Sequence, residues 1–145
     1  MTVALILSGG SGVRLGADIP KQYIEVNDRP IISYCIELLS RHGEIGAIQI
    51  VAAQEWQTLI RSCLEKYDVN SKFRGFSLPG ENRQLSIYHG LADIREYAED
   101  SDVVLIHDAA RPLLSEQMIT DCAAAMEGHD GVMPVLPMKD TVYRS

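Results

Sequence analysis

A chain of 145 residues, 46% of them hydrophobic and 23% charged, has the length and composition of one globular domain with a buried core. Its formal net charge of −7 argues against non-specific binding to DNA or RNA, because a polyanion would be repelled. A small anionic ligand stays open, since a local cluster of basic residues can outweigh the net charge.

The sequence favours a cytoplasmic protein that does not cross a membrane. No apolar run approaches the roughly 18 residues that a membrane helix needs, and the first residues carry no basic region typical of a signal peptide. The cysteines are odd in number and far apart, at Cys35, Cys63 and Cys122. This spacing fits neither a disulfide framework nor a structural zinc site.

Strands and helices are predicted to alternate along the chain. The apolar run at 3–7 indicates a central parallel strand covered on both faces. Further strands are predicted at 47–53, 74–78, 103–106 and 131–135, and helices at 30–40, 55–67, 86–97 and 115–126. Pro30 opens the first helix, and Ser115 is the expected N-cap of the last. The alternation predicts an α/β fold with a mostly parallel sheet flanked by helices, in which ligands bind beyond the carboxyl ends of the strands.

A glycine-rich turn at 8–12 follows the first strand. Glycines let the backbone approach a phosphate closely, although a tight turn that needs positive φ is the alternative. The turn lacks the lysine of a Walker A motif. It also departs from the dinucleotide-binding fingerprint, because Leu15 stands at the third glycine position and no acidic residue follows about 20 residues on. We therefore expect another scheme, in which Arg14 and Lys21 either supply the positive charge or are solvated surface cations.

Three motifs occur in a specific order. They are G-G-S-G-V-R-L-G with I-P-K-Q-Y at 9–23, P-G-E-N-R-Q-L-S at 79–86, and H-D-A-A-R-P at 107–112. Together they resemble the nucleotidyltransferases that activate sugar and polyol phosphates. The P-K-Q-Y form is similar to the 2-C-methyl-D-erythritol 4-phosphate cytidylyltransferase family and its close relative, ribitol-5-phosphate cytidylyltransferase. The resemblance spans the whole chain.

Some features depart from the family pattern. Ser8 and Gly9 stand where the methylerythritol enzymes often have two alanines, and Pro79 replaces the first glycine of the second motif. The family also continues past residue 145. We therefore expect residues 1–145 to be one nucleotidyltransferase domain, truncated at its C-terminal end.

The resemblance implies a Rossmann-like nucleotidyltransferase fold and an activity. CMP would pass from CTP to 2-C-methyl-D-erythritol 4-phosphate with release of pyrophosphate, with Mg²⁺ bridging phosphate oxygens. The alternatives are a ribitol-5-phosphate cytidylyltransferase that makes CDP-ribitol, and a CTP-binding fragment without turnover. The expected partners are CTP and a small polyol phosphate, with no nucleic acid and no membrane, and a homodimer at full length.

The first motif supplies the expected catalytic residues. Arg14 and Lys21 would neutralise charge on the α-phosphate and the leaving pyrophosphate. The turn would bind the nucleotide through Ser8, Gly9, Gly10 and Gly12.

The second motif is expected to read the base. Gly80 and Ser86 would face cytosine, and backbone carbonyls of the loop could accept from its amine. Ser86 is otherwise the N-cap of the following helix. Arg83 either reaches the phosphates or only pairs with Glu81.

The third motif and the segment at 139–141 are expected to bind metal and the second substrate. Asp108 ends a strand, so it either contacts the ribose or the metal or stabilises its loop through an Asx turn. Arg111 either binds the substrate phosphate or forms a structural salt bridge. Thr141 resembles a substrate-binding threonine of the family, with an ordinary strand residue as the alternative, and His107 is expected to be a packed strand-end histidine.

Overall fold

The computed structural model describes residues 1–10 and 19–137. The chain divides into two compact units, Met1–Leu114 and Ser115–Ser145. Three residues with predicted roles, Gly12, Arg14 and Thr141, lie outside the described residues. All the other predicted site residues belong to the first unit.

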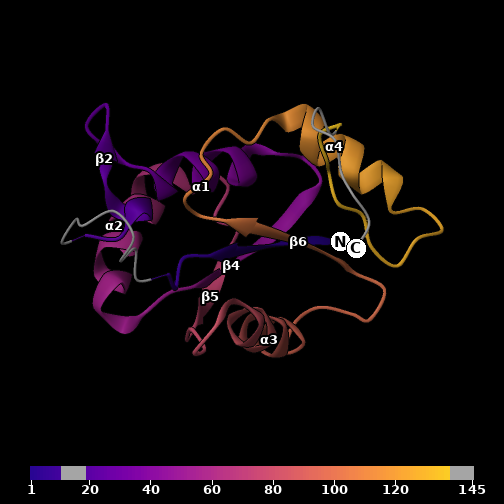
Figure 1. Ribbon diagram of the computed structural model, residues 1–145, viewed down its shortest axis with the longest axis horizontal. Coiled ribbons are helices and arrows are strands. Elements are labelled where there is room, and N and C mark those ends of the chain that lie inside the picture. The colour runs from indigo at the N-terminus through magenta and orange to yellow at the C-terminus, as the bar shows by residue number, and fades with distance from the viewer. Residues whose placement is uncertain (11–18, 138–145) are drawn as a thin grey trace, which may run out of the picture. The chain divides into compact units, whose positions relative to one another are not determined.

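A four-stranded parallel sheet forms the centre of the first unit (Figure 1). Its strands are β1 (Thr2–Leu7), β4 (Ile45–Val51), β5 (Phe73–Ser77) and β6 (Val103–Asp108). Their order is β5-β4-β1-β6, so β1 pairs with β4 on one side and β6 on the other. Four consecutive residues of β1 are buried, whereas β6 is only half-buried. The predicted parallel α/β architecture is confirmed.

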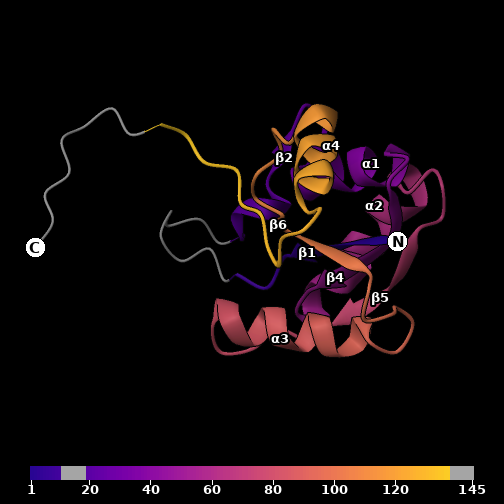
Figure 2. The same ribbon diagram turned by 90° about the vertical axis from the view of Figure 1, so that its right-hand side faces the viewer.

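Helices cover both faces of this sheet. They are α1 (Ile32–Arg41), α2 (Gln57–Tyr67) and α3 (Arg83–Ile94). Figures 1 and 2 show α1 on one face and α3 on the other, while α2 packs beside α1. Val3 and Leu5 of β1 form a core cluster with Ile94 of α3. The side chains of β1 alternate between the faces, so both faces receive apolar residues, as the continuous apolar run predicts.

Close packing of α3 on the sheet depends on Gly90. A Cβ added at Gly90 would lie 2.5 Å from Cδ1 of Leu5 and 3.2 Å from Cγ2 of Val51. The helix therefore approaches the sheet at a distance that only glycine permits. This contact fixes the distance of α3 from the sheet, and with it the position of the loop that precedes the helix.

A small hairpin between β1 and α1 was not expected from the sequence. Its strands are β2 (Glu25–Val26) and β3 (Arg29–Pro30), which pair antiparallel. Asn27 and Asp28 have φ angles of 52° and 60°, the left-handed conformation of a two-residue hairpin turn. Because Pro30 belongs to β3, α1 begins at Ile32, two residues later than predicted.

Other predictions also differ from the structure. The helix α3 begins at Arg83, three residues early, because the side chain of Asn82 accepts a hydrogen bond from the Leu85 amide and serves as the N-cap. The predicted strand at 131–135 is wrong. Residues 131–137 are exposed and have no regular structure, and no strand among the described residues pairs with them.

The second unit contains the helix α4 (Glu116–Ala125). The hydroxyl of Ser115 accepts a hydrogen bond from the Met118 amide, so the predicted N-cap is confirmed. In the part of the chain that the structure describes, no helix is long and apolar enough to cross a membrane.

Candidate functional site

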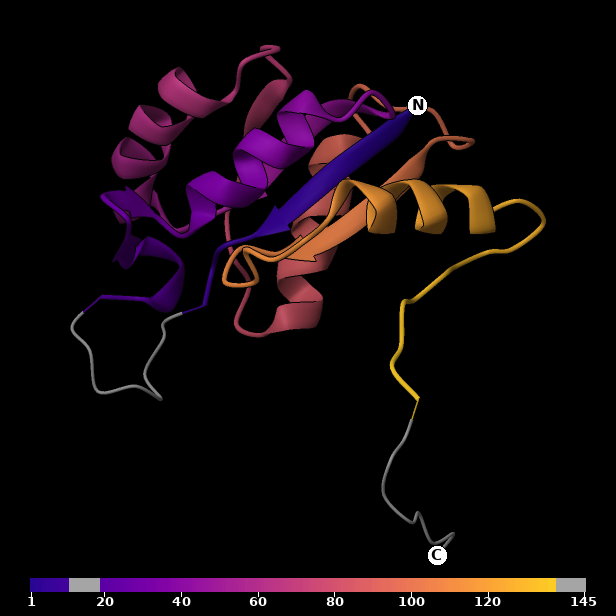
Figure 3. The same cartoon turned by 90° about the horizontal axis from the view of Figure 1, so that it is seen from above.

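Three loops meet at the carboxyl ends of the parallel strands. Leu7, the last residue of β1, lies opposite Val51 of β4 and Asp108 of β6. The Ser8 amide donates to the Val51 carbonyl at 2.8 Å, and the Ala109 amide donates to the Leu7 carbonyl at 3.0 Å. In Figure 3 the arrowheads of β1 and β6 point the same way. The first and third motifs therefore leave the sheet side by side.

The glycine turn touches the second motif directly. A Cβ added at Gly9 would lie only 2.6 Å from Cβ of Pro79, so a side chain at this position would displace the loop. Gly10 differs, because a Cβ there would meet no described atom within 4 Å. Neither residue has positive φ, so the alternative of a turn that needs positive φ does not apply to these two glycines. Among the described residues, nothing fills the space beside Gly10.

The next segment of the first motif ties the turn in place. The helical turn η2 (Lys21–Tyr23) follows Pro20, and Lys21 is exposed at its first position. Gln22 and Tyr23 are buried, and both side chains donate hydrogen bonds to the carbonyl of Ser8. The sequence alone predicted no role for Gln22 or Tyr23. Their position directly after the candidate cation Lys21 was a signal that could have identified them.

A hollow of about 280 Å³ opens at the glycine turn. Its walls are Ser8, Gly9, Gly10, Pro20, Ala53, Glu55 and Trp56. The Trp56 ring stacks on the Tyr23 ring with centroids 4.5 Å apart. Trp56 belongs to the helical turn η3 (Gln54–Trp56), which follows β4. The hollow therefore lies where parallel α/β sheets bind their ligands.

Gly80 and Ser86 define the shape of the second loop. The Gly80 amide donates to Oγ of Ser86 at 3.0 Å, and this hydroxyl donates to the Asn82 carbonyl at 2.9 Å. A Cβ added at Gly80 would lie 2.3 Å from Cβ of Leu85, so glycine is required here. Ser86 is buried and lies inside α3, which shows that its predicted alternative role as N-cap is wrong.

Asp108 links the second motif to the third. Its Oδ1 accepts from Nη2 of Arg83 and its Oδ2 from Nε of Arg111, each at 3.1 Å. The partner of Arg83 is thus Asp108 rather than Glu81, which was one of its two predicted alternatives, and the salt bridge considered for Arg111 is present. Both guanidinium groups are well exposed, and pairs of this kind contribute about 0.2–1 kcal/mol. A more highly charged anion could therefore replace Asp108 as the partner of either arginine.

His107 supports the loop that carries Arg111. One ring nitrogen, Nε2, lies 3.0 Å from the Arg111 carbonyl, which can only accept, so Nε2 carries the proton of the neutral ring. Burial lowers the pKa of His107, although the carbonyl partner and Asp108 oppose this shift. This agrees with the predicted packed strand-end histidine.

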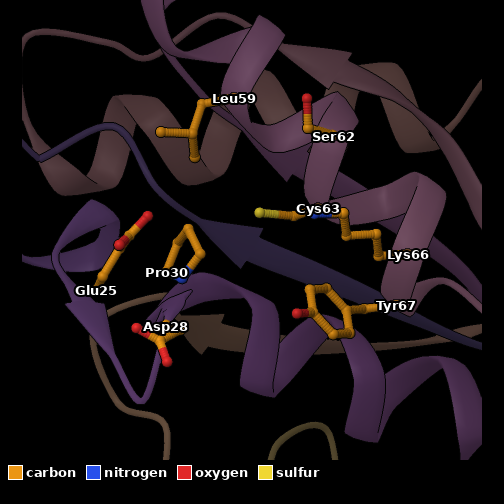
Figure 4. Close-up of a pocket in the computed structure, with 8 residues that line it drawn as sticks. All are labelled: Glu25, Asp28, Pro30, Leu59, Ser62, Cys63, Lys66 and Tyr67. Carbon is orange, nitrogen blue, oxygen red and sulfur yellow. The ribbon is translucent and has the colours of Figure 1, made fainter.

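A second hollow, of about 220 Å³, lies between the hairpin and α2 (Figure 4). Figure 4 shows the carboxylates of Glu25 and Asp28 on the hairpin side, with Cys63 and Lys66 on the helix side. Burial raises the pKa of the Cys63 thiol, so the thiol stays protonated and is a poor nucleophile. Among the described residues, none from the three motifs lines this hollow, and two carboxylates on one wall disfavour a phosphate ligand.

The parallel sheet, with a glycine turn at the end of β1, defines the chain as a Rossmann-like α/β protein. A solved structure titled 4-diphosphocytidyl-2C-methyl-D-erythritol synthase matches 99% of this chain and 63% of its own, with a TM-score of 0.79 and 21% identity. A synthase of the same description from Anaerococcus prevotii matches 86% of this chain and 50% of its own, with a TM-score of 0.67 and 30% identity.

The family model described as 2-C-methyl-D-erythritol 4-phosphate cytidylyltransferase matches residues 2–145, and the chain belongs to this family. It is 36% identical to the ribitol-5-phosphate cytidylyltransferase of Vibrio parahaemolyticus, over 97% of this chain and 59% of that protein. It is 37% identical to the 2-C-methyl-D-erythritol 4-phosphate cytidylyltransferase of Syntrophotalea carbinolica, over 95% of this chain and 58% of that protein. The chain thus spans just under three fifths of these relatives.

Proposed function

We propose that the chain is the nucleotide-binding part of an enzyme that transfers CMP from CTP to 2-C-methyl-D-erythritol 4-phosphate and releases pyrophosphate. The observation that carries the proposal is the meeting of the three motif loops at one edge of the sheet. The contact of Gly9 with Pro79 joins the first loop to the second, and the Arg83–Asp108 pair joins the second to the third. Membership in the cytidylyltransferase family supports the same reaction.

The reaction needs positive charge around the α-phosphate. A phosphate oxygen of the polyol phosphate attacks the α-phosphorus of CTP, and the bond between that phosphorus and the pyrophosphate oxygen breaks. Negative charge grows on the pyrophosphate as it leaves. Lys21 is exposed beside the glycine turn, where its ammonium can contact these oxygens, and Arg14 is its proposed partner from the sequence. Arg83 and Arg111 can exchange Asp108 for ligand phosphates.

The base is proposed to lie between the glycine turn and the loop at 79–86. Its selection would depend on backbone groups, because the side chains of Ser8 and Ser86 are buried and already hydrogen-bonded within the protein. Backbone carbonyls of the loop at 79–86 can accept from the cytosine amine, whereas uracil presents a carbonyl there and would be rejected. Ser86 contributes by fixing the position of Gly80.

Mg²⁺ is proposed as the cofactor, with Asp108 as its protein ligand. Mg²⁺ in such sites takes one or two carboxylates and completes its coordination with water and substrate phosphates. Among the described residues no cluster of three or more possible metal ligands occurs, which fits a metal held largely by the substrate. When bound, the ion would neutralise charge on the phosphates. Asp108 would have to release Arg83 or Arg111, whose exposed pairs break easily.

Ribitol 5-phosphate is the second candidate for the acceptor. Relatives named for either acceptor have nearly the same identity to this chain, 36% and 37%. The two acceptors differ in their carbon skeleton and share the reacting phosphate. The proposed roles of Lys21 and the glycine turn are therefore the same for both.

Pyrophosphate release by the whole gene product tests the proposal. CTP and Mg²⁺ are supplied with each polyol phosphate in turn, and calorimetric titration compares CTP, UTP, ATP and GTP. We expect release with 2-C-methyl-D-erythritol 4-phosphate and tightest binding of CTP. Release of pyrophosphate only with ribitol 5-phosphate would favour the second candidate. CTP binding without turnover of either polyol phosphate would indicate a CTP-binding module that is not an enzyme. Equal binding of all four nucleotides would overturn the cytidylyl assignment.

A further inference from the structure

We infer that Gln22 and Tyr23 are positioning residues, which turn the carbonyls of the glycine turn away from the ligand and fix where Lys21 stands beside it. The inference rests on the proposed function, because it assigns these residues a part in the same site. It adds two side chains that contact no ligand themselves and act through the backbone of residues 8–10.

Gln22 directs both hydrogens of its side-chain amide at the turn. Its Nε2 donates to the Ser8 carbonyl at 2.9 Å and to the Gly10 carbonyl at 3.0 Å. A side-chain amide has two hydrogens, so both are engaged. Gln22 is only 5% exposed, and these bonds are therefore protected from competing water.

Tyr23 binds the same turn from one residue further on. Its hydroxyl lies 2.9 Å from the Ser8 carbonyl and 2.8 Å from Oγ of Ser8. The carbonyl can only accept, so the phenol donates to it and the Ser8 hydroxyl donates to the phenol oxygen. Burial raises the pKa of Tyr23, so the phenol keeps the proton that this arrangement needs. The stacked Trp56 ring holds the phenol from its other side.

The direction of these bonds matters for an anion. Carbonyl oxygens carry partial negative charge and would repel a phosphate, whereas backbone N–H groups attract it. Gln22 and Tyr23 draw the carbonyls of Ser8 and Gly10 toward η2. The space beside Gly10 stays open to a ligand on the part of the turn that the structure describes.

The same contacts set the place of Lys21. Within η2, the Tyr23 amide donates to the Pro20 carbonyl at 2.9 Å and the Ile24 amide donates to the Lys21 carbonyl at 3.2 Å. The backbone of Lys21 is thus part of a short rigid segment, and Gln22 fastens this segment to the turn. Displacing a catalytic charge by about 1 Å can lower a rate about 100-fold.

Gln22→Met tests this inference in the whole gene product. Methionine has a similar length and apolar volume but donates no hydrogen bond. We expect kcat to fall about 10- to 100-fold while the dissociation constant of CTP changes less than about threefold. Tyr23→Phe keeps the ring and its stack on Trp56, and we expect a smaller loss, because Gln22 still donates to the Ser8 carbonyl. Gln117→Met, at an exposed position of α4, is the matched control and should leave kcat unchanged.

A double-mutant cycle with Lys21→Ala separates positioning from simple stabilisation. If Gln22 acts through Lys21, the double variant should be little slower than Lys21→Ala alone, since there is no longer a charge to position. Additive losses, or a lower melting temperature with unchanged kcat per folded molecule, would overturn the inference. An inactive wild-type protein would instead overturn the proposed function, and the positioning role with it.

Discussion

Lys21 is the residue on which the proposed chemistry depends most directly. Lys21→Ala should lower kcat about 100-fold or more, the order expected for loss of one preorganised charge, and change CTP affinity much less. Steady-state kinetics combined with calorimetric titration measure the two effects separately. Lys66→Ala, which removes an ammonium from the hollow beside the hairpin, is the control. A variant that keeps kcat and binds CTP poorly would reassign Lys21 to ground-state binding.

Gly9 and Gly10 are neighbours that differ in the space around them. A side chain at Gly9 would overlap Pro79, whereas a side chain at Gly10 would meet no described atom. Gly10→Ala places a methyl group in open space, so the fold should be retained while CTP binding weakens at least about tenfold, or roughly 1.4 kcal/mol. Gly9→Ala forces a methyl group against Pro79 and should lower the free energy of unfolding by about 1–3 kcal/mol. Chemical denaturation and nucleotide titration of both variants check this. Normal CTP binding by Gly10→Ala would show that no ligand approaches the turn there.

At this scale the sequence predicted which residues would lie together at one edge of the sheet better than it predicted their contacts. The described motif residues do meet at one edge, because glycines, cations and a strand-end carboxylate are visible as residue types. Their pairing was not visible. Arg83 joins Asp108 across 25 positions rather than its near neighbour Glu81, and Gln22 bonds backbone atoms that sequence patterns do not distinguish. Contacts of this kind depend on how separate elements pack together in space.

Among the elements, α3 depends most on a single position. Gly90→Ala should lower the free energy of unfolding by about 1–3 kcal/mol, because the added methyl group overlaps Leu5 and Val51 in the core. The loss should appear even though alanine favours a helix over glycine by about 1 kcal/mol. Gly43→Ala, where a Cβ meets no described atom, is the control and should change stability by less than about 1 kcal/mol. A neutral or stabilising Gly90→Ala would show that α3 can move outward freely.

The sequence predicted the elements wherever burial decides them. The strands β1, β4 and β6 and the helix α2 follow apolar patterns, and burial on both faces or along one stripe produces such patterns. The hairpin at 25–30 is too short to show an alternation of apolar and polar residues. The residue types that best indicated its turn were Asn27 and Asp28. The apolar residues at 131–135 resemble a strand locally, but a strand needs a neighbour for its backbone hydrogen bonds.

For the whole molecule, the pKa of His107 predicts how stability changes with acid. Burial lowers the pKa of His107 in the folded state, so the unfolded chain takes up a proton at higher pH, near the ordinary pKa of about 6.5. Stability contributed by the neutral ring is therefore lost as the pH falls through that value. Between about pH 7.5 and pH 5.5 the free energy of unfolding should fall less in His107→Gln than in the wild type. Parallel slopes in urea denaturation at the two pH values would contradict this.

The central place of β1 has a consequence for synthesis on the ribosome. Its strand is made first, but one of its two neighbours, β6, is made only at residues 103–108. The carboxyl edge of the sheet, where the three loops meet, is therefore complete only when almost the whole first unit has been translated. Before that point a ligand of this edge cannot stabilise the nascent chain, because a ligand stabilises only a folded state that can bind it. Until β6 is made, β1 keeps one unpaired edge, a feature that makes an incomplete chain prone to association.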